Sequence, residues 1–263
     1  PDSGPFGKAG FSISSIGLSI DGAQVAAVGS NGRQVLLAPR ARGKSSEVRR
    51  VYTGTKVLKP IIDRHGFTWL VDRTPAGARV VLVDARGAAV TSSVQSAPGI
   101  SGTDVSQCAM SPDGTVLACA VNRSKRSQLP RVAVSEVFRG VDGGVTRVGV
   151  ARVYPGAVSE LRSLTGIAFT SPNDLAVMGL TETGDTRVVL TPTDGSPGSA
   201  SQVQPDQVIG RALALAVSAS SVPGAPAVVR LLTRTRATLE LSPSGRWIDT
   251  GLEAKFSTLT FVG

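Results

Sequence analysis

The segment Val105–Val121 places two runs of small and apolar residues on either side of Ser111-Pro112-Asp113-Gly114. Proline presets φ, aspartate can hydrogen-bond its own backbone, and glycine readily takes a positive φ, so this tetrapeptide predicts the turn of a β-hairpin. Weaker copies of the hairpin recur along the chain, which indicates an array of repeats rather than one isolated hairpin. Repeats of this kind bury their faces against neighbouring copies.

The spacing of the turns sets the period of the array. Gly22 and Gly66 are 44 residues apart, Gly66 and Gly114 are 48 apart, and Pro172-Asn173 and Pro223-Gly224 follow at longer intervals. A period of about 40 to 50 residues with four short strands is that of a β-propeller blade. We therefore predict an all-β fold, a β-propeller of four-stranded antiparallel blades with five recognisable repeats and five or six blades. The alternative architecture, a pair of β-sandwiches, is disfavoured by the regular spacing.

The first strands of the five repeats begin at Ile16, Leu58, Val105, Leu164 and Ala212. Each is followed by further short runs rich in Val, Leu, Ala and Thr, separated by turn residues, as β-strands require. The last apolar run, Phe256–Val262, has two interpretations. It either closes the ring with the N-terminal segment, giving five blades, or begins a sixth blade.

The length of 263 residues is compatible with one closed β domain. We predict that residues 1–10, which are rich in Gly and Pro, form a linker or arm, and that residues 11–263 form a single β-propeller domain. No apolar run is long enough to span a bilayer, and the N-terminus lacks the features of a signal peptide. We expect any targeting signal to have been removed or to lie upstream.

Both cysteines of the chain, Cys108 and Cys119, lie in the hairpin of the third repeat. If Asp113-Gly114 forms the turn, stepping outward along the two strands places the cysteines directly opposite each other. Paired residues of antiparallel strands have Cα atoms about 4.5 or 5.5 Å apart, a separation that a disulfide can bridge. Two interpretations stay open: a disulfide, which would indicate an oxidising compartment, and two small buried thiols. The spacing fits no zinc motif.

The formal net charge of +9 favours anionic partners or surroundings. Basic residues gather in two predicted connections, which are candidate partner-contact loops. These residues are Arg40, Arg42, Lys44, Arg49, Arg50, Arg123, Lys125, Arg126 and Arg131. Binding of single-stranded nucleic acid would need aromatic side chains among the charges, and only Tyr52 lies near them, so we expect no nucleic-acid partner. The loops are either solvated or contact an acidic protein face or an anionic envelope surface.

The residues that could support catalysis are few. His65, the single histidine, lies beside Gly66 at a predicted turn, and we interpret it as an exposed turn residue. Asp63, Asp72 and Asp84 lie on or beside strand ends, where a carboxylate pair lining a central channel would be a hydrolase or lactonase site. Aspartates at such positions more often hydrogen-bond the local backbone. We therefore expect no catalytic residues, no metal and no cofactor.

Three segments carry a resemblance to a known family. Ile16–Val28, Leu58–Arg73 and Val105–Val121 resemble the C-terminal β-propeller of LpqB-type lipoproteins of actinobacteria. The composition, rich in Arg, Ala, Val and Gly and poor in Lys, also suits a high-GC actinomycete. The similarity covers most of the chain and is strongest over Ile16–Val121.

The resemblance implies a location and a partner. LpqB-type proteins are exported, anchored to the outer face of the cytoplasmic membrane through a lipidated N-terminal cysteine, and carry a GerMN-type domain before the propeller. They are associated with the MtrA–MtrB two-component system through the extracytoplasmic part of the sensor kinase MtrB. The chain has no lipobox cysteine and no GerMN-like segment, so we expect it to be the propeller of a longer lipoprotein.

Two functions from different classes follow. The first is a non-enzymatic extracytoplasmic interaction domain that modulates the MtrA–MtrB system and cell-envelope homeostasis, with arginine charge steering an acidic partner. The alternative is a small-ligand-binding or hydrolytic propeller that acts on a cell-wall-derived substrate in its central channel. A ligand site would need several convergent polar groups on the innermost strands, and those strands are mostly Ala, Ser, Val and Ile.

Overall fold

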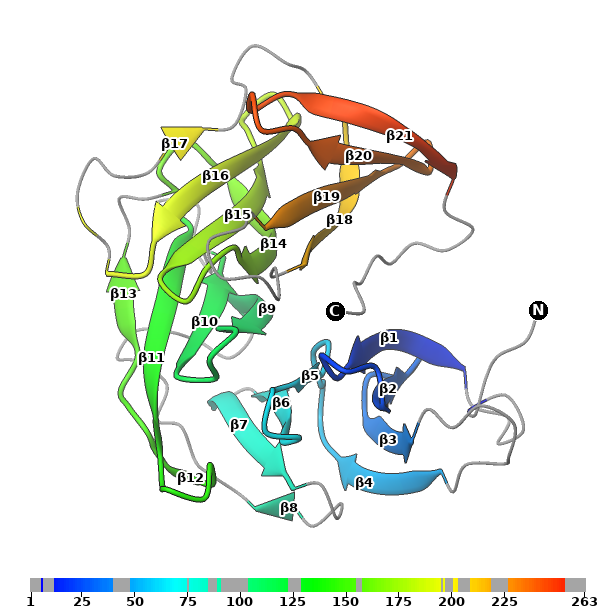
Figure 1. Ribbon diagram of the computed structural model, residues 1–263, viewed down its shortest axis with the longest axis vertical. Coiled ribbons are helices and arrows are strands. Elements are labelled where there is room, and N and C mark those ends of the chain that lie inside the picture. The colour runs from blue at the N-terminus through cyan, green and yellow to red at the C-terminus, as the bar shows by residue number, and fades with distance from the viewer. Residues whose placement is uncertain are drawn as a thin grey trace. The chain divides into compact units, whose positions relative to one another are not determined.

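Five antiparallel β-sheets make up the computed structural model (Figure 1), four with four strands and one with five. The structure describes residues 6, 12–39, 48–74, 76–84, 89–90, 104–122, 129–154, 158–194, 196, 201–202, 209–218 and 227–253. Sheets of consecutive antiparallel strands, repeated along the chain, are the blades of a β-propeller. The predicted all-β propeller class is therefore confirmed. The strand predicted at Phe256–Val262, on which the choice between five and six blades depends, lies outside the described residues.

The described residues divide into two compact units. The first takes the residues before Asp104 together with Val137–Val150, and the second takes Asp104–Glu136 and the residues from Ala151 on. The first unit holds two complete sheets. Their strands are β1 (Ile13–Leu18), β2 (Gln24–Gly29), β3 (Gln34–Pro39) and β4 (Arg49–Thr53), then β5 (Ile61–Ile62), β6 (Thr68–Thr74), β7 (Gly77–Val83) and β8 (Ala89–Val90).

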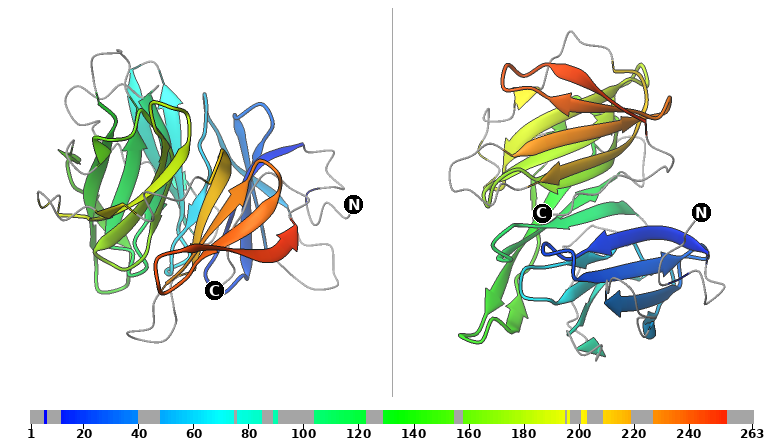
Figure 2. Two further views of the ribbon diagram at one scale, coloured as in Figure 1. Left: turned by 90° about the horizontal axis from the view of Figure 1, so that it is seen from above. Right: turned by 45° about the vertical axis from the view of Figure 1, so that its right-hand side comes forward.

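The other three sheets lie in the second unit, apart from the end of β11 and β12, which belong to the first. Strands β9 to β13 are Val105–Met110, Val116–Val121, Arg131–Arg139, Val145–Val148 and Arg152–Tyr154. Strands β14 to β17 are Ser163–Phe169, Asp174–Leu180, Thr186–Pro192 and Ser201–Gln202. Strands β18 to β21 are Ala212–Ser218, Val228–Thr233, Ala237–Leu241 and Trp247–Glu253, and Figure 2 shows their strong twist.

The middle strands are covered on both faces, which explains their composition. Strand β2 is buried at five of its six positions and β15 at five of its seven. Strands covered on both sides read as continuous runs of aliphatic residues without polar alternation. The turns between strands have the predicted chemistry, since Gly22, Gly66 and Gly114 have φ of 66°, 81° and 74°. Those angles lie in the left-handed region that favours glycine.

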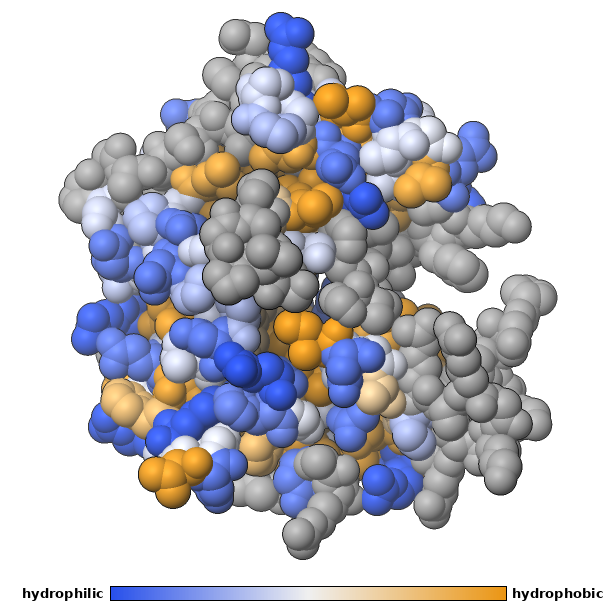
Figure 3. All heavy atoms as spheres, viewed as in Figure 1, coloured by the Kyte–Doolittle hydropathy of each residue, from blue (hydrophilic) through white to orange (hydrophobic). Residues whose placement is uncertain are grey.

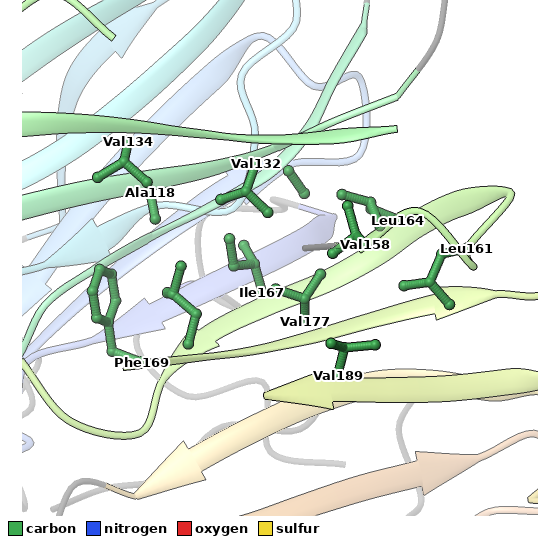
Figure 4. Close-up of a cluster of buried hydrophobic side chains, with 12 residues drawn as sticks. Ala118, Val132, Val134, Val158, Leu161, Leu164, Ile167, Phe169, Val177 and Val189 are labelled. Atoms are coloured by element: carbon green, nitrogen blue, oxygen red, sulfur yellow. The ribbon is translucent and has the colours of Figure 1, made fainter. Parts of the chain in front are cut away.

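Neighbouring sheets within each unit pack face to face. In the second unit, Ala118, Val132 and Val134 of the third sheet meet Ile167 and Val177 of the fourth, and Figure 4 shows these side chains pointing toward one another. In the first unit, β2 and β3 pack against β6 and β7 through a second aliphatic cluster. Burial of such apolar surface is the main source of stability in a fold of this kind.

One described residue of the N-terminal segment lies in the core. Phe6 is buried against Val25, Ala27, Leu36 and Ala38 of the first sheet. The other residues of the predicted 1–10 linker lie outside the described residues. Phe6 is therefore an anchoring side chain of the first sheet.

The third sheet differs from the predicted pattern of four strands. Strand β11 has nine residues, and its two halves pair with different partners. Its N-terminal half pairs with β13 and its C-terminal half pairs with β12. The short strand β13 was not predicted, and the prolonged end of β11 forms with β12 a hairpin that packs in the first unit.

We predict that Gly179→Ala destabilises the domain by about 3 kcal/mol, because a side chain there overpacks the sheet. A Cβ on Gly179 would lie 2.4 Å from the backbone oxygen of Ser163 and 2.8 Å from Cδ1 of Leu161. The control is Gly184→Ala, where φ is +88° and no atom lies within 4 Å, with an expected cost of about 1 kcal/mol. Urea denaturation measures both, and equal losses would contradict the packing argument.

Candidate functional site

The two cysteines are joined across the third sheet. Cys108 of β9 is the register partner of Cys119 of β10, as the predicted turn requires. Their sulfur atoms lie 2.05 Å apart and their Cα atoms 4.1 Å apart. The bond ties together the first two strands of this sheet.

The structure describes three of the nine basic candidates. Arg49 and Arg50 are exposed and adjacent on β4, the edge strand of the first sheet. Arg131 is half-buried at the start of β11, in the other unit. The remaining six, Arg40, Arg42, Lys44, Arg123, Lys125 and Arg126, lie outside the described residues. Charged edge strands of this kind oppose unwanted pairing with other sheets.

A side-chain oxygen caps the first hairpin turn of the first and third sheets. Ser19 and Ser111 stand three residues before Gly22 and Gly114, and each accepts a backbone hydrogen bond from that glycine through its carbonyl. Their hydroxyl oxygens also accept backbone N–H groups beyond the turn. In the first turn, the hydroxyl of Ser19 and the backbone N–H of Ala23 lower the pKa of Asp21. These hydroxyls need no counter-ion.

Asp63 occupies the equivalent position in the second sheet, three residues before Gly66. Its Oδ1 accepts the backbone N–H groups of His65 and Phe67 at 2.9 and 3.0 Å, so its carboxylate caps the turn as the serine hydroxyls do. Its Oδ2 accepts the indole N–H of Trp69 at 2.8 Å. The carboxylate has no exposed surface. A cation beside a buried charge of this kind offsets the cost of its burial.

Arg139, at the end of β11, supplies that cation. Its Nη2 lies 2.5 Å from Oδ2 of Asp63, and its Nη1 donates to the carbonyl of Gly143 at 2.8 Å. The guanidinium also lies 5.9 Å from the ring centroids of Phe67 and of Trp69. Charge pairing and cation–π contacts thus act on one guanidinium.

Arg139 belongs to the hairpin that we call the β11–β12 arm, Val137–Val150 (Figure 1). The turn of the arm also packs on the second sheet, since a Cβ on Gly143 would lie 2.7 Å from Nδ1 of His65. The ion pair therefore holds the inner face of the arm against the β5–β6 turn. His65 is exposed at this turn, as predicted.

The outer face of the arm carries a different set of side chains. Phe138 and Arg147 are register partners on β11 and β12, and the guanidinium of Arg147 lies 4.1 Å from the centroid of the Phe138 ring. Both residues are exposed. Val141, in the turn, is fully exposed at 113% of the reference area. Figure 3 shows a small, isolated apolar spot on the surface where Figure 1 has the β11–β12 turn.

Asp72 is the second buried aspartate of the second sheet. Its carboxylate accepts the hydroxyl of Tyr52 at 2.9 Å and the backbone N–H groups of Thr55 and Lys56 at 2.9 and 2.8 Å. These bonds fasten the segment after β4 to β6. Burial, then the hydrogen bond to Asp72 and its charge, raise the pKa of Tyr52, and Arg79 opposes them.

These contacts assign local roles to two of the three aspartates considered for catalysis. Asp63 and Asp72 hold turns and connections through backbone N–H groups, and Asp84 is half-buried directly after β7. Within the described ranges, no three or more His, Cys, Asp or Glu side chains are grouped to hold a metal ion. The described residues also contain no helix with the length and hydropathy that a bilayer span requires.

Residues that the sequence analysis did not single out form the most distinctive part of the site. They are Phe138, Arg139, Val141 and Arg147, all on the arm. The one signal for them is the turn sequence Gly140–Gly144, in which Val141 is an aliphatic residue among turn formers. Nothing local in the sequence connects Arg139 to Asp63.

We predict that Asp63→Asn destabilises the domain by about 3 kcal/mol, because it removes the carboxylate charge that pairs with the guanidinium of Arg139. The matched control is Glu136→Gln, which breaks an exposed ion pair with Arg152 at 3.6 Å. That change should cost less than about 0.5 kcal/mol. Chemical denaturation compares them, and similar stabilities for the two variants would refute the structural role of Asp63.

We predict that the tyrosine at position 52 makes stability fall with rising pH above about 10. The folded chain retains the hydroxyl proton of Tyr52 at a pH where the unfolded chain has lost it, so the unfolded state binds fewer protons and stability declines. Melting temperatures measured across this range should fall less steeply for Tyr52→Phe. Identical slopes in the wild-type chain and the Tyr52→Phe variant would contradict the prediction.

The fold is similar to that of several proteins of known structure. No curated protein sequence matches the chain. Solved structures with a similar fold include a hydrazine synthase from Kuenenia stuttgartiensis (TM-score 0.62, 14% identity, 88% of this chain and 64% of that chain). They also include a TolB-like protein from Agrobacterium tumefaciens (TM-score 0.62, 14% identity, 91% of this chain and 80% of that chain). A gluconolactonase from Xanthomonas campestris is similar as well (TM-score 0.56, 14% identity, 91% of this chain and 76% of that chain).

At these identities the likenesses show the fold alone, and this chain spans less than two thirds of the hydrazine synthase chain. The family match is more specific. Residues 1–236 match the lipoprotein LpqB beta-propeller domain, in agreement with the resemblance of Ile16–Val28, Leu58–Arg73 and Val105–Val121. The chain therefore belongs to the LpqB β-propeller domain family.

Proposed function

We propose that this domain is a non-enzymatic protein-interaction domain of an extracytoplasmic, membrane-anchored lipoprotein, and that it modulates the sensor kinase MtrB of the MtrA–MtrB system. The observation that carries the proposal is the family match over residues 1–236, since the family is named for a lipoprotein. The partner comes from the resemblance to LpqB-type proteins. The lipid anchor would belong to a segment upstream of this chain.

The use of acidic side chains supports an interaction role over catalysis. The carboxylates of Asp63 and Asp72 accept backbone N–H groups and a buried aromatic or phenolic donor, so they are fixed within turns and connections. A hydrolytic role would require a carboxylate presented to substrate. The fold is also shared with proteins of differing activity, and a fold by itself does not assign chemistry.

The charge of the chain supports an acidic partner. A net charge of +9 speeds encounter with an acidic surface and makes the association sensitive to salt. Arg49 and Arg50, exposed side by side on an edge strand, are the described members of the predicted basic loops best placed to act in this way. An anionic envelope surface would be attracted by the same charges.

We predict that the purified chain binds the purified extracytoplasmic domain of MtrB from the same organism, and that high salt weakens the complex. Isothermal titration calorimetry at low and high salt measures both effects. Arg49→Glu with Arg50→Glu should weaken binding more than the control pair Arg211→Glu with Arg246→Glu, which changes the net charge equally at other exposed positions.

Absence of binding at low salt would overturn the proposed partner. Equal weakening by the two charge-reversal pairs would show that net charge alone drives association. Saturable binding of a wall-derived sugar or peptide by a chain that does not bind the kinase would favour a ligand-binding or hydrolytic propeller.

A further inference from the structure

The β11–β12 arm presents an apolar side chain that contributes nothing to the fold. Val141 is 113% exposed, so the turn holds it entirely in solvent. The preceding residue, Gly140, and the following Gly143 and Gly144 add no side chains that would cover it. A large aliphatic side chain kept fully exposed at a hairpin turn is a candidate anchor for binding, since its burial is favourable only in a complex.

The same arm presents an arginine in a fixed orientation. The guanidinium of Arg147 stacks on Phe138 at 4.1 Å across the two strands. None of the ion pairs within the described part of the chain includes Arg147. Stacking on the Phe138 ring limits the conformations of the Arg147 side chain. The N–H donors at the edge of its planar guanidinium group remain available for a carboxylate. Arginine and aromatic residues are enriched at the energetic centres of protein interfaces.

The arm is held in place from its inner face. Arg139 reaches the buried carboxylate of Asp63 and the carbonyl of Gly143, and Gly143 lies against His65. Alternation along the strand then directs Phe138 to the opposite face of β11 from Arg139. An element that is already ordered loses less conformational entropy on binding than a flexible loop does.

Arg147 and the net charge of the chain favour an acidic partner. Its charged residues are Arg139, Arg147 and Asp142, and Arg139 is already paired with Asp63. The carboxylate of Asp142 accepts the backbone N–H of Gly144 and so stabilises the turn. Asp142 is exposed in the turn, and Arg147 is the positive charge that the arm offers outward, within a chain whose net charge is +9. The complementary surface is a carboxylate beside an apolar pocket.

We propose that the β11–β12 arm is the element by which this domain docks onto an acidic face of its partner protein, with Val141 in an apolar pocket and Arg147, held by Phe138, on a carboxylate. The inference rests on the proposed function, because the partner used to test it is the extracytoplasmic domain of the sensor kinase. It adds the docking element, which the family match leaves open.

The test measures binding of that kinase domain to the full 263-residue chain and to four variants. Val141→Ser and Arg147→Gln remove the anchor and the charge, and Ile248→Ser and Arg211→Gln are matched controls at other exposed positions. Each arm variant should raise Kd about tenfold, and each control less than about twofold. Arg147→Gln should also reduce the salt dependence, whereas Val141→Ser should leave it unchanged. Melting temperatures verify folding.

The outcomes separate the two proposals. If the wild-type chain binds the kinase domain and the arm variants bind as the controls do, the arm is not the docking element, while the proposed function stands. If the wild-type chain does not bind at low salt, the proposed function fails and the docking proposal fails with it. Loss of co-flotation with phosphatidylglycerol vesicles in the arm variants, with unchanged kinase binding, would assign the arm to a lipid surface and overturn the proposal.

Discussion

The buried charge of Asp63 is the constraint on which the second sheet and the arm depend. Burying a carboxylate without exposed surface costs free energy unless its oxygens have hydrogen-bond partners, and a cation beside it offsets more of that cost. Two backbone N–H groups, the indole of Trp69 and the guanidinium of Arg139 meet that requirement. One side chain thereby connects a turn, the core of the sheet and a distant hairpin.

Features determined by local chemistry could be predicted from the sequence. The positive φ of Gly22, Gly66 and Gly114 follows from short turn motifs, and their spacing indicated four-stranded units. The register that places Cys108 opposite Cys119 follows from counting outward from one turn, because each residue of one strand pairs with the next residue of the other. The contacts of Asp63 with the backbone N–H groups of His65 and Phe67 are likewise the ordinary behaviour of an aspartate beside a turn.

Features that depend on distant partners could not be predicted. Asp63 and Arg139 are separated by 76 positions, and neither lies in a motif that refers to the other. The full length of β11 is also not evident, because the strand ends where its pairing with β12 ends, and no short motif marks that position. Strand β13 exists only because the first half of β11 is free to pair with it after β12 has turned away. These are consequences of packing between sheets.

Asp63 takes the place of the serines Ser19 and Ser111 in the second sheet. This difference explains why the turn of the second sheet binds Arg139 of the arm, whereas the turns of the first and third sheets need no such cation. Ser19 and Ser111 cap their turns with neutral hydroxyls, which are satisfied locally. A carboxylate at the same position makes the same backbone bonds and adds a charge, so a cation must come from elsewhere in the unit. Arg139 meets that need on the inner face of the hairpin, and alternation along the strands places Phe138 and Arg147 on the outer face. Pairing the buried charge thus exposes the surface that the arm offers to a partner.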